Sequence, residues 1–335
     1  MKLLYTPRFF DPAEADLTYA PDIAGALREG VEFGKANHLQ SADILLQRGI
    51  GRLLEMTDLQ LDFCEGGRLP VTGARKVVLR TCERLINGVV EDYYAGLLIS
   101  FDEHGHFHIS FDHNWENESG ELLDLSKHGR AAILTRNEKY SPAFTATAFG
   151  PNGPYEVGRF RSRFNRQDTV DYAVYLQVMG QGPIWVFVPH CVAGTDGVNL
   201  HPLLAETIAF ACGVRSITPT IVRKGHLVDT DWFGPLEPCR PRYPDGVFRN
   251  DIIAEMNRFS AVEFSGIAED FCDFAMKKQT LDAFSRFELN SKKLRFVTDL
   301  TAPIVPNAAH VVAQNEAAKK VGVKFIMHDT PFSES

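Results

Sequence analysis

The sequence predicts an α/β protein in which a mostly parallel sheet lies between two layers of helices, with one long insertion. The main observation is that short apolar runs alternate with segments of helical spacing from about residue 52 onward. Such a rhythm favours parallel strands that are covered on both faces. The chain has 335 residues, 44% of them apolar and 23% charged, which is ordinary for a globular protein of one large or two smaller domains.

The expected elements follow one another in this rhythm. Short apolar runs predict strands at residues 53–57, 95–101, 184–188, 220–222, 261–267, 294–297 and 323–327. Apolar residues at helical spacing predict helices at residues 74–90, 203–212, 247–259, 271–284 and 307–321. The turn sequence Pro-Asp-Gly opens the helix at 247–259. Right-handed crossovers would bring the loops that follow the strands to one edge of the sheet, where ligands bind in such folds.

Two regions fall outside the rhythm and set the domain organisation. Residues 1–50 form an extension with one helical pattern, at about 23–37, and residues 51–335 form the main domain. The main domain is interrupted by an insertion at 113–182, which is rich in Gly, Pro, Asn and Arg and closes with a helical pattern at about 169–179. A connection of this length is usually a lid, a subdomain or an oligomer contact. Its arginines could bind an anion or form a solvated or salt-bridged face: Arg159, Arg161, Arg163 and Arg166.

The overall charge and the apolar runs limit the partners. A net charge of −8 argues against nucleic acid, because phosphate binding needs a basic surface. The first residues lack the apolar core of a signal peptide, and no apolar run reaches the length of a membrane span. The six cysteines form no CxxC pair, which favours reduced thiols. We therefore expect a cytoplasmic protein that binds neither nucleic acid nor a membrane, acts on a small molecule and forms a homo-oligomer.

A candidate nucleophile stands where an apolar run passes into a helix. Cys272 follows the expected strand at 261–267, and the N–H groups at a helix amino terminus favour the thiolate. Asp58 and Lys224 follow two other expected strands, so the three side chains can meet at one edge of a parallel sheet. The aspartate could take the thiol proton, with Asp62 as the competing carboxylate, and the lysine could stabilise negative charge. The alternatives are a buried, unreactive cysteine and a solvated lysine.

A second cluster has the residue types of a metal site. Asp102 and His104 lie two residues apart at a strand end and would point to the same side of an extended chain. His190 follows the next expected strand and is the natural third ligand, with His106 or His108 as a fourth. One carboxylate and two imidazoles suit Zn²⁺ or a similar ion. The alternative is an exposed polar loop.

With these residues, the chain resembles the isochorismatase-like cysteine hydrolases, and within them the nicotinamidases. The resemblance covers roughly residues 50–115 and 183–330 and rests on five ordered motifs. These motifs are Asp58-Leu-Gln-Leu-Asp-Phe-Cys-Glu-Gly-Gly67, Asp102-Glu-His104 followed by His108-Ile-Ser-Phe111, Val188-Pro-His-Cys-Val-Ala-Gly-Thr-Asp-Gly-Val-Asn-Leu200, Lys224-Gly225 and Gly266-Ile-Ala-Glu-Asp-Phe-Cys272.

The resemblance implies a function and a role for each motif. The implied activity is an amidohydrolase that releases ammonia from nicotinamide or a similar small carboxamide through a cysteine thioester. The resemblance assigns Asp58, Lys224 and Cys272 to a catalytic triad, and Asp102, His104 and His190 to one divalent metal, zinc first, with iron or manganese possible. It also implies a cis peptide between Ile267 and Ala268, with the N–H groups of Ala268 and Cys272 as an oxyanion hole.

The sequence also departs from the nicotinamidase pattern, and these departures bear on the substrate. Phe187 stands where tryptophan is usual, Asp273 stands where valine is usual, and Asp231-Trp-Phe-Gly234 replaces a Tyr-Ser-x-Phe stretch. Phe63, Phe187 and Trp232 could line a pocket for an aromatic ring or could pack in the core. Hydrolysis of another amide or a ureido compound, or a non-catalytic binding role on the same fold, are the alternatives.

Overall fold

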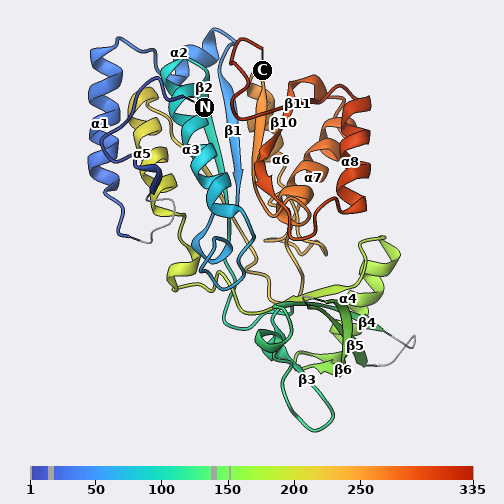
Figure 1. Ribbon diagram of the computed structural model, residues 1–335. Coiled ribbons are helices and arrows are strands. Elements are labelled where there is room, and N and C mark those ends of the chain that lie inside the picture. The colour runs from blue at the N-terminus through green and yellow to red at the C-terminus, as the bar shows by residue number, and fades with distance from the viewer. Residues whose placement is uncertain (1, 14–18, 137–141, 151, 335) are drawn as a thin grey trace.

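The computed structural model describes residues 2–13, 19–136, 142–150 and 152–334 (Figure 1). The remaining positions (1, 14–18, 137–141, 151 and 335) lie outside the described residues, most of them in the predicted extension and insertion. A six-stranded sheet in the order β11-β10-β9-β1-β2-β8 forms the centre, and every neighbouring pair in it is parallel. Its strands are β1 (Arg52–Thr57), β2 (Tyr94–Asp102), β8 (Thr220–Lys224), β9 (Val262–Ile267), β10 (Leu294–Ala302) and β11 (Lys324–Ile326).

Helices cover both faces of this sheet, so the predicted three-layer arrangement is confirmed. One layer holds α1 (Ile23–Ala36), α3 (Ala74–Val90) and α5 (Pro202–Arg215), and the other holds α6 (Asn250–Arg258), α7 (Cys272–Arg286) and α8 (Ala309–Lys320) (Figure 1). The central strands are buried almost throughout, as expected for a sheet that is covered on both sides. Among the described residues, no helix is long and apolar enough to cross a membrane.

The extension belongs to the first helical layer. It holds α1 and a short second helix, α2 (Ala42–Gln47), which the sequence pattern did not indicate. Helix α1 packs closely on α5, and the glycine at position 30 allows this. A Cβ atom there would lie only 2.2 Å from the Phe210 carbonyl oxygen. Gly34 has the same relation to Val214, at 2.6 Å. The extension is therefore an integral part of the domain's surface layer.

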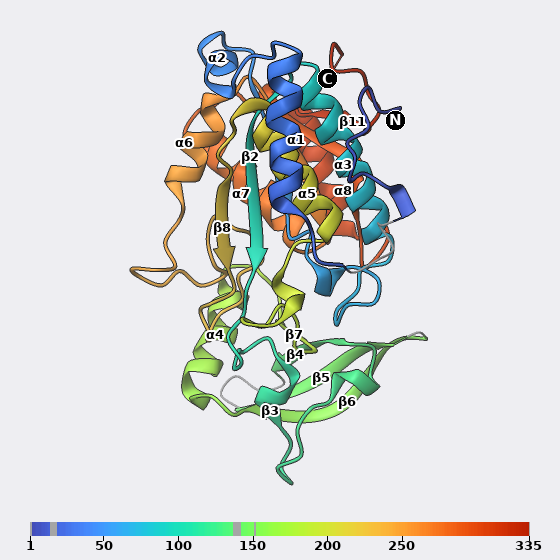
Figure 2. The ribbon, with the colours of Figure 1, turned by 90° about the vertical axis from the view of Figure 1, so that its left-hand side faces the viewer.

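The insertion forms a subdomain around a second, antiparallel sheet with the order β3-β6-β5-β4-β7. Its elements are β3 (Trp115–Glu116), β4 (Ala131–Arg136), β5 (Ala143–Gly150), β6 (Gly153–Ser162), α4 (Arg166–Val178) and β7 (Ile184–Phe187). This subdomain lies at the carboxyl ends of the parallel strands, away from both chain termini (Figures 1 and 2). The part of the sheet edge where a ligand would bind therefore faces the subdomain.

The prediction for one strand was wrong about its sheet. The strand at 184–188 was expected to continue the parallel sheet, but β7 pairs antiparallel with β4 of the insertion. Its four residues, Ile-Trp-Val-Phe, are an apolar run, and such a run does not reveal whether its partner is a parallel or an antiparallel strand. Strands β3 to β6 of the insertion were not expected from the sequence. Other differences are shifted ends: β10 runs on to Ala302, and α6 begins at Asn250 because the preceding residues form a turn and loop.

Candidate active site and metal centre

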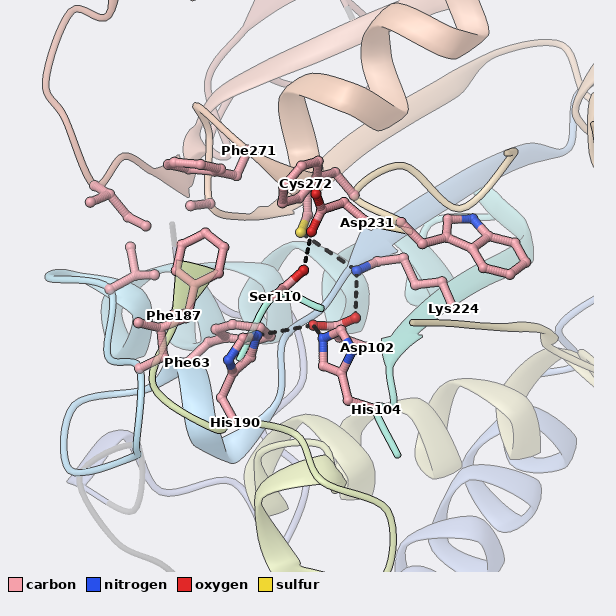
Figure 3. Close-up of a pocket in the computed structure, with 16 residues that line it drawn as sticks. Phe63, Asp102, His104, Ser110, Phe187, His190, Lys224, Asp231, Phe271 and Cys272 are labelled. Carbon is pink, nitrogen blue, oxygen red and sulfur yellow. Dashed lines mark hydrogen bonds and ion pairs between the residues drawn. The ribbon is translucent and has the colours of Figure 1, made fainter. Parts of the chain in front are cut away.

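The carboxyl ends of four parallel strands bring the predicted residues to one place (Figure 3). Strand β1 ends at Thr57, immediately before Asp58, and pairs there with β2 and β9. Strands β2 and β8 end side by side, with Asp102 opposite Lys224 in the register. Strand β9 leads through a short loop to Cys272, the first residue of α7. The sheet register alone therefore places an acid, a lysine and a thiol at one edge.

Lys224 joins the two predicted clusters. Its ammonium nitrogen lies 2.8 Å from Oδ2 of Asp58 and 3.0 Å from Oδ1 of Asp102. The same nitrogen lies 3.5 Å from the sulfur of Cys272. Burial alone would lower the pKa of Lys224, but the carboxylates of Asp102 and Asp58 outweigh it and raise that pKa well above its usual value. The lysine is therefore a fixed positive charge between the thiol and both carboxylates.

Asp58 is held in position from both sides. Its backbone has a φ of +52°, a conformation that aspartate tolerates better than most residues and that turns the chain out of β1. Oδ1 accepts a hydrogen bond from the Ser100 hydroxyl at 2.8 Å, while Oδ2 faces Lys224. The carboxyl group is fully buried, and burial raises its pKa although Lys224 acts against this. A buried carboxyl of raised pKa is suited to accept and return a proton.

The thiol of Cys272 lies at the amino terminus of α7. Burial raises its pKa well above the usual value, and the negative charge of Asp58 adds to this effect while Lys224 opposes it. The thiol therefore keeps its proton until a base removes it. The N–H of Cys272 has no partner within the helix, because the first N–H groups of a helix never do. The peptide between Ile267 and Ala268 is cis, as the resemblance implied.

Asp102, His104 and His190 form a buried group with the donor atoms of a metal site. One ligand atom from each residue lies within 4.8 Å of the others. Nε2 of His104 is 2.9 Å from Oδ2 of Asp102, and Nε2 of His190 is 3.4 Å from the same oxygen (Figure 3). All three side chains are at least nine-tenths buried. A carboxylate with two imidazoles is a donor set that divalent transition metals bind.

The other ring nitrogens show why these residues fit a cation. Nδ1 of His104 lies 3.0 Å from the Gly225 carbonyl oxygen, and Nδ1 of His190 lies 2.9 Å from that of Val188. A carbonyl oxygen only accepts, so each Nδ1 carries a proton and each Nε2 is turned toward Asp102. A cation between them would be bound by both Nε2 atoms and by the carboxylate. Histidines oriented through backbone carbonyls are typical of metal sites.

The two alternative ligands do not join this group. His106 is exposed, and its carbonyl oxygen accepts a hydrogen bond from His113. His108 is buried beside His104, with 4.4 Å between the ring centroids, but its Nδ1 accepts a hydrogen bond from the Ser110 N–H. Among the described residues, only Asp102, His104 and His190 bring their donor atoms together.

Two residues of the first motif support the site rather than enter it. The Gln60 amide donates to the Asp102 carbonyl at 2.7 Å and accepts from the Asp102 N–H at 2.8 Å, which holds the end of β2. Asp62, the competing carboxylate, instead accepts a hydrogen bond from the Cys191 N–H at 2.7 Å. It thereby anchors the loop that carries His190, and the structure gives it no contact with Cys272.

A cavity opens beside these clusters and reaches Phe187 of β7. All three aromatic residues expected to line a pocket do so: Phe63, Phe187 and Trp232. Lys224, Ala268 and Cys272 line the same cavity. The sequence reasoning missed two polar residues of its wall, Ser110 and Asp231. The departure from the Tyr-Ser-x-Phe pattern was the signal that could have marked Asp231.

Solved structures similar to this chain are isochorismatase-like hydrolases. They include nicotinamidases, pyrazinamidases and an N-carbamoylsarcosine amidase. The yeast nicotinamidase bound to nicotinaldehyde is 17% identical, with a TM-score of 0.49, over 82% of this chain and 99% of that one. The pyrazinamidase of Pyrococcus horikoshii in complex with zinc is 16% identical, with a TM-score of 0.43, over 82% and 98%. The N-carbamoylsarcosine amidase of Thermoplasma acidophilum is 14% identical, with a TM-score of 0.41, over 84% and 98%.

No family model matches the sequence. No curated protein matches it either. Identities below 20% and TM-scores below 0.5 do not transfer an activity, so the function of this chain has to follow from its own residues.

Proposed function

We propose that this chain is a cysteine amidohydrolase of the isochorismatase-like superfamily that releases ammonia from nicotinamide or a similar small carboxamide. The observation that supports this most is the position of the Lys224 ammonium, which contacts Asp58 at 2.8 Å and the Cys272 sulfur at 3.5 Å beside one cavity. A thiol, a carboxyl group and a fixed cation at the amino terminus of a helix are the parts that acyl transfer through a thioester needs.

The reaction begins with the transfer of the Cys272 proton to Asp58. The raised pKa of both groups keeps the thiol protonated and makes the carboxylate a stronger base than an exposed aspartate. The thiolate attacks the amide carbon, and the N–H groups of Ala268 and Cys272 are our candidates to hold the developing oxyanion. Asp58 returns the proton to the departing nitrogen, which leaves as ammonia. The acyl group stays on the Cys272 sulfur as a thioester. Water, deprotonated by Asp58, then releases the carboxylic acid and restores the thiol.

The metal belongs to the same proposal. Asp102, His104 and His190 would hold one divalent ion, for which we propose zinc, with iron or manganese as alternatives. When bound, such an ion would offer open positions to a water molecule or to a neutral donor atom of the substrate. Lys224 touches Asp102 at 3.0 Å, so the metal group and the nucleophile stay in a fixed relation.

We further propose that the insertion at 113–182 acts as a lid over the cavity. The subdomain lies over the carboxyl ends of the parallel strands, and Phe187, on the strand that closes its sheet, lines the cavity (Figure 2). A cover of this kind would exclude water while the thioester forms and would narrow the set of substrates. A contact between subunits of a homo-oligomer is the competing role.

The experiment that tests the function is ammonia release from a panel of small carboxamides, with bound metal measured on the same sample. We expect turnover of at least one member by protein that holds about one metal ion per chain. Purification without chelator and a parallel sample supplemented with Zn²⁺ or Fe²⁺ control for loss of metal. Absence of ammonia release from every amide by the supplemented protein would contradict the proposal.

A further inference from the structure

Asp231 is a buried carboxyl group in the cavity wall that the proposed reaction does not use. It lies in the loop after β8, its exposed fraction is 3%, and it lines the same cavity as Cys272 (Figure 3). The Ser110 hydroxyl donates a hydrogen bond to Oδ1. The Tyr172 hydroxyl donates to Oδ2 at 2.8 Å and accepts from the Asp231 N–H at 2.9 Å. The carboxyl group is therefore held in a fixed orientation by the strand-end loop and by helix α4 of the insertion.

Across the described ranges of the chain, this carboxyl group has no cationic partner, because no ion pair there involves Asp231. Arg240, nine residues further along the chain, pairs with Asp229 at 3.1 Å and stacks over the Tyr172 ring. Burial raises the pKa of Asp231 to about 6, against the effect of its hydrogen bonds to Ser110 and Tyr172, so the group is mostly ionised at neutral pH. A buried charge without a partner is costly, and such charges in proteins are normally paired.

The carboxylate also keeps acceptor capacity toward the cavity. Two carboxylate oxygens offer about four lone-pair sites, and the hydroxyl groups of Ser110 and Tyr172 occupy one on each oxygen. The remaining sites suit a group that carries several N–H donors and a positive charge. Aromatic side chains of the same cavity, Phe187 and Trp232 among them, keep water away and strengthen such an ion pair.

We propose that Asp231 binds the ammonium group of the substrate, which makes the substrate a small carboxamide that also carries a positively charged amine. The amide half of this statement rests on the proposed function, since it places the carboxamide at Cys272. The ammonium half stands on the fixed, unpaired carboxylate of the cavity wall. The two halves together explain why an acidic segment occupies the position where the nicotinamidase pattern has Tyr-Ser-x-Phe.

A binding experiment tests the ammonium half without turnover. The Cys272→Ala protein, loaded with Zn²⁺, is titrated calorimetrically with aliphatic amides that carry a terminal amine, from glycinamide through β-alaninamide to longer chains. Each is compared with the amide that carries a hydroxyl group in place of the amine. We expect the best amine to bind about 10- to 100-fold more tightly than its hydroxyl counterpart. This is the range for a hydrogen bond to a charged group.

The same titration of Cys272→Ala with Asp231→Asn added should remove this preference, because the amide keeps the shape but not the charge. Asp245→Asn, the same change at an exposed position, is the matched control and should leave the preference intact. Equal binding of amine and hydroxyl probes, no measurable binding of any amine, or a preference that survives Asp231→Asn would each overturn the proposal. Where Asp231→Asn does not fold, the comparison of the two probes on Cys272→Ala alone decides.

Turnover by the unmodified protein separates the two proposals. If the amines bind selectively but no carboxamide releases ammonia, the recognition by Asp231 stands and the amidohydrolase proposal fails. If neutral carboxamides are hydrolysed equally well by the unmodified protein and by Asp231→Asn, and no amine is preferred, the amidohydrolase proposal stands and the recognition fails.

Discussion

Two sets of residues at the cavity are built in different ways. The reaction end consists of Asp58, Lys224 and Cys272, which lie at or after the carboxyl ends of β1, β8 and β9 in one parallel sheet. The second set, which we call the far wall, is Asp231, which lines the cavity from the loop after β8, and Tyr172 of helix α4, which holds Asp231 through hydrogen bonds. Sheet register fixes the first set, whereas contacts between separate segments position the second. This division lets the chemistry stay constant while the choice of substrate depends on residues outside the sheet.

The largest effect should come from the reaction end, through Cys272→Ala. Loss of the nucleophile should lower kcat for every substrate by about 10⁴-fold or more, since removal of one member of a catalytic triad costs this much. The measurement is ammonia release over the whole carboxamide panel, together with a thermal melt to show that the protein folds. The loss of kcat should be the same for all substrates, because the nucleophile attacks the carboxamide group that they share.

Cys64→Ala is the matched control for this prediction. Cys64 is also buried, and burial raises its pKa to about 12, but it does not line the cavity that holds Cys272. It should keep kcat within a few-fold of the unmodified protein, because it has no contact with Lys224 or Asp58. Near-normal turnover by Cys272→Ala, or a comparable loss in Cys64→Ala, would remove Cys272 as the nucleophile.

The reaction end was open to prediction because its residues are tied to regular structure. Each of Asp58, Asp102, Lys224 and Cys272 follows an apolar run, and in a parallel sheet the ends of such runs must meet at one edge. The alternation of strand and helix therefore gave both the fold class and the neighbourhood of these side chains. His190 was placed correctly beside Asp102 although its strand, β7, lies in another sheet.

The far wall could not be predicted in the same way. Nothing in the sequence near Tyr172 shows that its hydroxyl group reaches a residue 59 positions further along the chain. The antiparallel strands of the insertion carry short runs with weak patterns, and their pairing depends on turns and register. Asp62 shows the same limit within a motif, because only the fold reveals that it binds the Cys191 N–H instead of serving the thiol.

The metal group adjoins the reaction end through the contact of Asp102 with Lys224, and His104→Ala should have the next largest effect. Without one of three ligands, the bound metal should fall from about one per chain to a small fraction, and kcat/KM should fall by about 100-fold or more. Elemental analysis of the purified protein and ammonia release on the same sample measure both. A larger effect on substrates with a metal-binding donor atom would show that the metal also serves recognition.

His106→Ala supplies the control for the metal prediction. This histidine lies two residues away in the same segment, but it is exposed and its donor atoms are not part of the group. It should keep both the metal content and the activity of the unmodified protein. Equal metal content in His104→Ala and His106→Ala would contradict the assignment of the ligands.

The smallest effect should come from the far wall, through Tyr172→Phe. The change removes the hydroxyl group that donates to Asp231 and accepts from its N–H, and leaves the ring in the core. A lost buried hydrogen bond costs about 1–3 kcal/mol, so we expect a lower melting temperature and a kcat/KM reduced by roughly 3- to 10-fold for amine-bearing amides. Neutral amides should change less, because they do not need an oriented carboxylate.

Tyr175→Phe, the same substitution on the half-buried part of helix α4, is the control and should change neither quantity. The ratio of kcat/KM between amine-bearing and neutral amides is the decisive readout, since a general loss of stability would lower both alike. The same preference can be measured as a ratio of binding affinities on Cys272→Ala with and without Tyr172→Phe. If the kcat/KM ratio shifts and this affinity ratio does not, Tyr172 acts on the reaction instead of on recognition. A kcat/KM ratio that does not shift at all would show that the far wall does not select the substrate. The two sets of residues would then no longer differ in function.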